Sequence, residues 1–209
     1  MKHYLILTLL CLTACRATYY AAWEKLGREK RDILRNRVVD ARDEQKEASQ
    51  QFKTALERMK EMYGFDGGKL EAAYNRFKGE YEDCESRATK VRSRIKDVET
   101  VAGDLFKEWE QELRDISDPT MRGDSRRKLD DARSKYAQLL TTMKRAETSM
   151  SPILTKFRDN VLYLKHNLNA QAIGALKGES VKIEGDITRL IADMNAAIAQ
   201  AEAFIKTLN

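Results

Sequence analysis

Proline and aromatic residues are scarce in this chain, and their scarcity narrows the fold class. Only 2 of the 209 residues are proline and 8% are aromatic, whereas 34% are charged. Proline interrupts helices because it lacks a backbone N–H and clashes with the preceding turn. A highly charged chain with so few breakers departs from an average globular domain toward long helices or a coiled coil.

The N-terminal hydrophobic run is too short to cross a membrane. Residues 4–11 fall far short of the ~20 apolar residues that span a bilayer. They follow Lys2 and precede small residues, which is the pattern of a cleaved export signal. Leu12-Thr13-Ala14-Cys15 resembles the lipobox of bacterial lipoproteins. The resemblance implies a signal peptide at 1–14, cleavage before Cys15 and acylation of that cysteine; the alternative is an ordinary cleaved signal with a cysteine nearby by chance.

The residue after Cys15 bears on the subcellular localisation of the protein. Arg16 follows, so no aspartate occupies the second position. By resemblance to the sorting rule of Gram-negative lipoproteins, this favours lipid anchoring at the periplasmic face of the outer membrane. Cleavage would leave 195 residues with a formal net charge of +4, since Lys2 is the one charged residue removed. That length suits a single domain, 15–209.

Cysteine and histidine are too rare for most site chemistry. Cys84 would be the one free thiol and His166 the one histidine of the mature chain. Zinc sites need three or four ligands at set spacing, and nucleophilic catalysis needs a base beside a serine or cysteine. No phosphate-binding glycine motif occurs. We therefore expect no enzyme, no catalytic residue, no metal and no cofactor, and the weak interspersed charge predicts no nucleic-acid partner.

Hydrophobic periodicity is the strongest structural signal. Apolar residues recur at alternating steps of four and three, which indicates helices packed through a heptad seam. The longest such stripe has twelve members: Leu70, Tyr74, Phe77, Tyr81, Cys84, Ala88, Val91, Ile95, Val98, Ala102, Leu105 and Trp109. Three further stripes precede and follow it, and Gln45 is the polar exception in the first.

Breakers between the stripes divide the chain into four helices, expected at about 17–62, 69–116, 125–166 and 170–208. Glycines end the first helix. Residues 117–124 form the second turn, and Asp124 or Ser125 caps the third helix. Asn169 is the first choice for the cap of the fourth helix, and the alternative position for that boundary is 174–180. At about 1.5 Å per residue the helices are roughly 60 to 70 Å long. Short links predict an all-α, elongated, antiparallel four-helix bundle or coiled coil with up-down-up-down topology.

Pro152 lies inside the third predicted helix, where the stripe keeps its phase. We expect it to bend the helix near residues 149–151 without reversing the chain. The alternative is that Pro152 starts a new helix, because proline suits the first helical position.

Three groups of residues are candidates for function. Cys84 falls in the stripe, so a packed thiol is favoured over a redox sensor. Paired carboxylates such as Glu80 and Glu82, or Glu108, Glu110 and Glu112, are interpreted as ion-paired surface. In the predicted topology the first and third turns lie at the same end of the bundle, far from the lipid. Their polar and aromatic residues either form a surface for a partner or serve only to end and cap the helices. These residues are Phe65, Asp66, Lys165, His166 and Asn167.

At the other end, residues 16–37 carry a net charge of +4 beside aromatic side chains. This segment either contacts anionic headgroups or closes the bundle end. Its candidate contact residues are Tyr19, Tyr20, Trp23, Lys25 and Arg28.

Several runs are similar to an exported bacterial family catalogued as domain of unknown function 2959, over essentially the whole mature chain. They are Tyr19-Tyr20, Trp23-Glu24-Lys25-Leu26-Gly27, Lys30-Arg31-Asp32-Ile33-Leu34, Phe65-Asp66-Gly67-Gly68, Glu108-Trp109-Glu110 and Leu164-Lys165-His166-Asn167-Leu168-Asn169-Ala170. The resemblance implies a helical envelope protein of proteobacteria and brings no activity.

The sequence thus predicts a non-enzymatic lipoprotein that acts as scaffold or adaptor for an envelope protein. The alternative is a carrier that holds lipid or another apolar ligand inside its bundle, favoured by small residues and methionine in the fourth stripe: Met194, Ala197 and Ala201. A homo-oligomer stays open.

Overall fold

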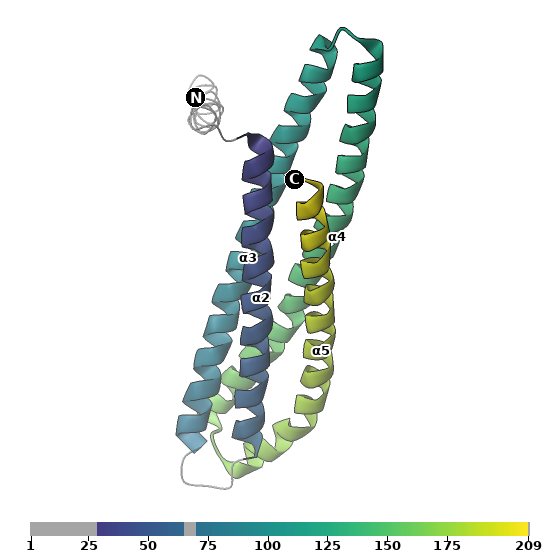
Figure 1. Cartoon of the computed structure of the whole chain (residues 1–209). Helices are drawn as coiled ribbons and strands as arrows, with labels where there is room; N and C mark the ends of the chain where they lie inside the picture. Colours follow the sequence, from purple (N-terminus) through teal and green to yellow (C-terminus); the bar gives the residue numbers. More distant parts are fainter. Residues whose placement is uncertain (1–28, 65–69, 209) are drawn as a thin grey trace, which may run out of the picture.

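Long helices make up nearly all of the computed structural model, which describes residues 29–64 and 70–208 (Figure 1). In these two ranges the elements are α2 (Lys30–Tyr63), α3 (Leu70–Asp115), α4 (Pro119–His166) and α5 (Ala170–Thr207). The described residues contain no strand. The prediction of an all-helical chain is confirmed.

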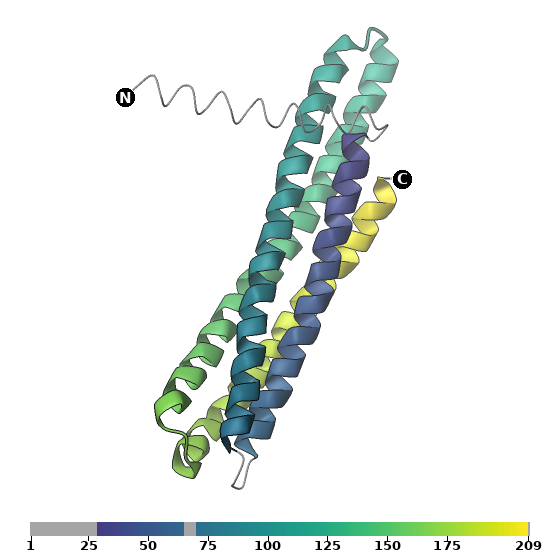
Figure 2. The same cartoon turned by 90° about the vertical axis from the view of Figure 1, so that its left-hand side faces the viewer.

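The helices pack side by side along a common axis. Each helix contacts the next one in the chain, and α5 also contacts α2. Figures 1 and 2 show consecutive helices running in opposite directions, with the start of α2, the end of α5 and the α3–α4 turn toward one end of the molecule. These contacts are consistent with the predicted up-down-up-down bundle.

The four helices differ in length more than the sequence suggested. α3 and α4 have 46 and 48 residues, whereas α2 and α5 have 34 and 38. The backbone of Glu29 is extended, with φ −71° and ψ 155°, so α2 begins at Lys30 and one continuous helix from residue 17 is wrong. As a result, the α3–α4 hairpin projects beyond the other two helices (Figure 2).

The predicted heptad stripe forms the core. From Tyr74 to Ala102 its members are buried, and Leu70, Leu105 and Trp109 are partly buried and pack against it. Three phenylalanines join α2, α3 and α4. The ring of Phe157 stacks on Phe52 at 6.4 Å and meets Phe77 edge-on at 5.4 Å between centroids. Such pairs add roughly 0.5–1.5 kcal/mol beyond the area they bury.

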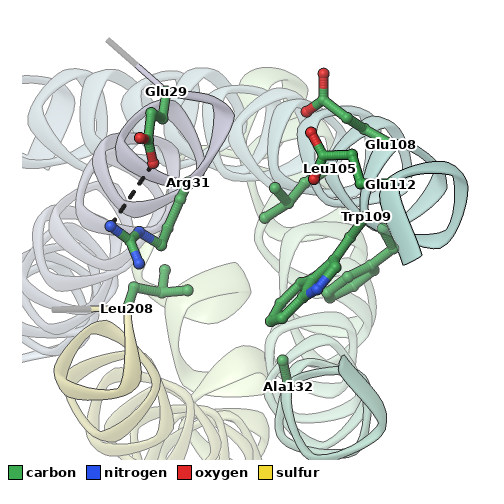
Figure 3. A pocket seen from close by; sticks show the side chains of 9 residues that line it. Glu29, Arg31, Leu105, Glu108, Trp109, Glu112, Ala132 and Leu208 are labelled. Carbon is green, nitrogen blue, oxygen red and sulfur yellow. Dashed lines mark ion pairs between the residues drawn. The ribbon is translucent and has the colours of Figure 1, made fainter. Parts of the chain in front are cut away.

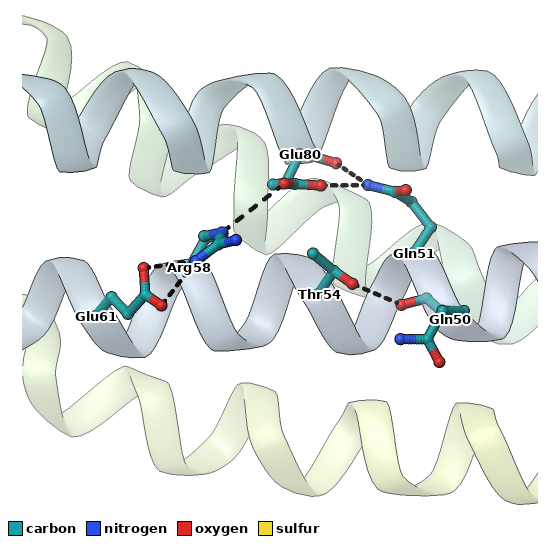
Figure 4. A network of polar contacts seen from close by, with 6 residues as sticks. All are labelled: Gln50, Gln51, Thr54, Arg58, Glu61 and Glu80. Carbon is teal, nitrogen blue, oxygen red and sulfur yellow. Dashed lines mark hydrogen bonds and ion pairs between the residues drawn. The ribbon is translucent and has the colours of Figure 1, made fainter.

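Polar contacts between helices line the outside of the core. Gln51 of α2 donates to the Glu80 carboxylate of α3 at 2.6 Å, and Arg58 approaches the same carboxylate at 3.9 Å (Figure 4). Arg133 on α4 donates to Glu110 on α3 at 2.8 Å, and this bond holds the pKa of the Glu110 carboxyl below its usual range. Four of the five carboxylates interpreted as ion-paired surface are ion-paired, namely Glu80, Glu82, Glu108 and Glu110, whereas Glu112 has no such partner among the described residues. Each exposed pair contributes little energy, but together they favour one register of the helices.

Local chemistry fixes the helix ends, and here one boundary was wrong. The Asp118 side chain accepts from the N–H of Met121 at 2.8 Å, so α4 begins at Pro119 instead of 125. Proline has the backbone angle that a first helical residue needs, and aspartate is a strong N-cap. The predicted turn at 117–124 is therefore three residues, 116–118, and the cap at Asp124 or Ser125 is not used.

The prediction of the boundary at Asn169 and the prediction that the helix continues through Pro152 are both confirmed. Asn169 accepts from the N–H of Ala172 at 2.9 Å and caps α5, so the first choice for that boundary is confirmed and residues 174–180 lie inside the helix. α4 continues through Pro152, so the chain does not reverse there and the alternative of a new helix is wrong.

Candidate functional site

Cys84 is buried about one third of the way along α3, as the heptad predicted. Its exposed fraction is 0%, and burial raises the pKa of the thiol, with the charges of Glu80 and Asp83 acting in the same direction. A reactive thiol needs exposure and a lowered pKa. Cys84 has neither property, so its role is packing.

At the end of the bundle where α2 and α4 finish, two tyrosines connect the helices around the first and third turns. The hydroxyl of Tyr63 donates to Oδ1 of Asn160 at 2.6 Å, and the hydroxyl of Tyr74 donates to the Val161 carbonyl at 3.4 Å. Tyr63 and Tyr74 flank the first turn, whereas Asn160 and Val161 lie in the last two turns of α4. The two turns therefore share one end of the molecule (Figure 1).

The predicted tip residues fall partly outside the structure. Phe65 and Asp66 lie outside the described residues. Lys165, His166 and Asn167 are exposed at the end of α4. Nδ2 of Asn167 donates to the Tyr163 carbonyl at 3.0 Å, so its amide serves the helix end. Basic residues in a last turn also stabilise the helix dipole.

Sequence reasoning missed two exposed apolar side chains beside the tip. Leu162 and Tyr163 on α4 are 55% and 44% exposed. Their place outside the heptad stripe was the available signal. With Lys165 and His166 they form a surface of mixed apolar and basic character, which we call the distal surface.

The candidate membrane-proximal residues, Tyr19, Tyr20, Trp23, Lys25 and Arg28, lie outside the described part of the chain, as does Cys15. The structure nevertheless describes a groove of about 260 Å³ where that segment joins α2 (Figure 3). We call it the proximal groove. Its lining residues come from the start of α2, the projecting hairpin and the end of α5: Glu29, Arg31, Leu105, Phe106, Glu108, Trp109, Glu112, Ala132 and Leu208.

The α3 side of the proximal groove is held firmly. The indole N–H of Trp109 donates to the Ser125 hydroxyl at 2.9 Å, which fixes the ring. Phe106 meets Tyr136 at 5.4 Å, and the guanidinium of Arg133 lies 5.6 Å from the Phe106 ring. In Figure 3, Leu105 and Trp109 lie across the opening from Arg31 and Leu208. The apolar floor is thus preformed.

Carboxylates surround that floor. Glu29, Glu108 and Glu112 line the groove together with one cation, Arg31, a formal charge of −2. Arg31 lies 3.7 Å from Glu29, and Lys30 pairs with Glu108. No sequence pattern pointed to this site, because its walls come from four separate stretches of the chain.

The described ranges contain neither a cluster of metal-binding side chains nor a helix that could span a membrane. Within 29–64 and 70–208 no group of three or more His, Cys, Asp or Glu side chains is placed to hold a metal ion. Within those ranges, too, no helix combines the length and apolar character that crossing a bilayer requires.

Comparisons with known proteins identify the family without an activity. Neither the curated proteins nor the solved structures contain a match. Residues 19–208 match the family described as Protein of unknown function (DUF2959), which covers all four described helices. The chain belongs to this family.

Proposed function

We propose that the protein is a non-enzymatic lipoprotein of the cell envelope, an up-down-up-down bundle that serves as scaffold or adaptor. The observation that carries the proposal is the filled seam between long helices. The largest fully buried side chains come from α2, α3 and α4, and the fourth stripe is buried from Ile183 to Phe204. A packed rod keeps its ends at a fixed separation, which is what a scaffold requires.

The proposed address comes from the sequence. Leu12-Thr13-Ala14-Cys15 provides the lipidation motif, with Cys15 as the anchor, and Arg16 favours the periplasmic face of the outer membrane. The distal surface would then stand roughly 50 to 70 Å from the anchored end, given about 1.5 Å per helical residue. We propose that an envelope protein partner contacts that surface together with Phe65, Asp66 and Asn167.

The anchor predicts a clear effect of one substitution. Cys15→Ser removes the thiol that would carry the diacylglycerol, so palmitate labelling should vanish and the protein should leave the membrane fraction, because stable anchoring needs several acyl chains. The measurement is labelling and fractionation of cells that produce either form. Cys84→Ala is the matched control and should stay labelled and membrane-bound. A Cys15→Ser protein that remains in the outer membrane would refute lipidation.

A carrier of apolar ligands is the competing function, and the cavities favour the scaffold. The proximal groove has about 260 Å³, and a shallow groove of about 500 Å³ between α4 and α5 is open to solvent and lined by residues that include Gln138, Thr141 and Gln200. Neither encloses an acyl chain, because the first groove is small and both are open to solvent, whereas ligand pockets bury most of the ligand surface.

Native mass spectrometry separates the two functions. The chain 15–209 with Cys15→Ser, purified from cells by mild extraction, should show one mass series that corresponds to protein alone. A second series shifted by the mass of a phospholipid, persisting after gentle activation, would favour the carrier instead.

A further inference from the structure

We infer that the proximal groove is the docking site of the chain's own residues 16–28, with the aromatic side chains of that segment seated against Trp109. The segment itself lies outside the described residues. The groove, the sequence of the segment and the place where the two join support the docking. The other possible occupants are a lipid surface or a separate ligand.

The junction places the segment at the groove. Glu29, the residue that follows it, lines the groove itself. Trp23 precedes Glu29 by six residues, so even an extended chain keeps its ring within ~20 Å of the opening. A tethered segment competes at an effective concentration on the order of millimolar, which an untethered ligand rarely reaches.

Size and shape favour protein side chains as the occupant. About 260 Å³ is less than the roughly 300–1,000 Å³ typical of small-molecule pockets, so one or two large side chains would fill it. The floor combines an indole face with Leu105, Ala132 and Leu208 (Figure 3). Aromatic rings pack well against such a surface, and the segment supplies Tyr19, Tyr20 and Trp23.

The charges are complementary as well. Residues 16–28 contain Arg16, Lys25 and Arg28 against Glu24, a formal charge of +2. The groove lining carries −2, and Glu112 forms no ion pair with the described residues. An anionic membrane surface would share the attraction for the basic segment but would be repelled by the carboxylates of the groove.

Docking would set the geometry of the whole rod. With Tyr19 and Trp23 held at the bundle end, three residues, 16–18, would separate the anchor from the folded part. The bundle would then be held close to the membrane instead of swinging on a long tether. This consequence depends on lipidation of Cys15, whereas the docking itself does not.

The test uses chain 15–209 with Cys15→Ser, which contains every described residue and removes the lipid. Ala132→Arg fills the groove floor, and Ala137→Arg, an exposed position on the same helix outside the groove, is its control. Trp23→Ala should lower Tm by roughly 5 °C in the parent and in Ala137→Arg, and should have no effect in Ala132→Arg. Equal effects of Trp23→Ala in all three backgrounds, or none in the parent, would overturn the proposal.

Fluorescence gives a second measurement that does not depend on stability. With Trp109 kept in the groove, the difference between the spectra of the parent and of Trp23→Phe gives the emission of Trp23. Without any vesicles, its emission should be blue-shifted and only weakly quenched by acrylamide. When Ala132→Arg is added, the emission should shift to the wavelength of a solvent-exposed tryptophan and be quenched readily. If Trp23 is exposed in solution and shifts only with vesicles of phosphatidylethanolamine and phosphatidylglycerol, the segment binds the membrane and the inference is wrong.

Discussion

Replacing Cys84 with aspartate should destabilise the protein by roughly 3–5 kcal/mol, because it places an unpaired carboxylate where water does not reach. The Cys84 side chain is 0% exposed and sits in the buried stripe of α3 between Tyr81 and Ala88. Its neighbours along the helix include the anionic Glu80 and Asp83, which already disfavour a negative charge on the thiol. A chain of this size should lose roughly 6–20 °C in Tm, since each kcal/mol shifts Tm by about 2–4 °C. Thermal melting followed by circular dichroism measures the change.

Cys84→Ala is the matched control for that experiment. It removes one buried sulfur and should cost only about 1 kcal/mol, since small cavities in a core are tolerated. The native thiol should also resist alkylation until the protein is unfolded. Equal melting temperatures for Cys84→Ala and Cys84→Asp would mean that this part of α3 is open to water.

Gln45→Met should raise stability by roughly 2 kcal/mol, which is unusual for a core substitution. Gln45 is 0% exposed on α2, and neither Nε2 nor Oε1 has a hydrogen-bond partner among the described residues. An unpaired buried donor or acceptor costs about 1–3 kcal/mol. Methionine has a similar unbranched shape without the amide, so it removes that cost and keeps the packing.

Gln50→Met provides the comparison, because Gln50 is exposed on the same helix. It should change the free energy of unfolding by less than about 0.5 kcal/mol. Denaturant unfolding of the two variants measures the difference. If Gln45→Met is destabilising, the amide makes a favourable interaction in solution, and the buried amide is not a cost to stability.

The helices were predictable because their cause is periodic and local. A stripe such as Phe77, Cys84 and Val91 can be buried only if the chain is helical, and this holds wherever the partner helices lie. Helix ends depend on finer chemistry. Asn169 was recognised as a cap, but Pro119 was read as a breaker, although proline both ends helices and begins them.

The proximal groove could not be predicted from sequence. It exists because α2 begins at Lys30 and α5 ends at Thr207 while the α3–α4 hairpin continues past them. Leu105, Ala132 and Leu208 become neighbours only once the relative lengths and offsets of the helices are set. The exposed Leu162 and Tyr163 were missed for a related reason, since periodicity describes the buried face and says little about the rest.

The unequal helices also give the molecule a gradient of bending stiffness. Through most of its length four helices resist flexing together, whereas the projecting part of the hairpin is two helices thick (Figures 1 and 2). It is held by side chains such as Leu113 and Leu129 and by the bond between Trp109 and Ser125. Regions with fewer packed neighbours open locally at lower free energy. A force on the rod would therefore be absorbed first at the hairpin, leaving the far end undistorted.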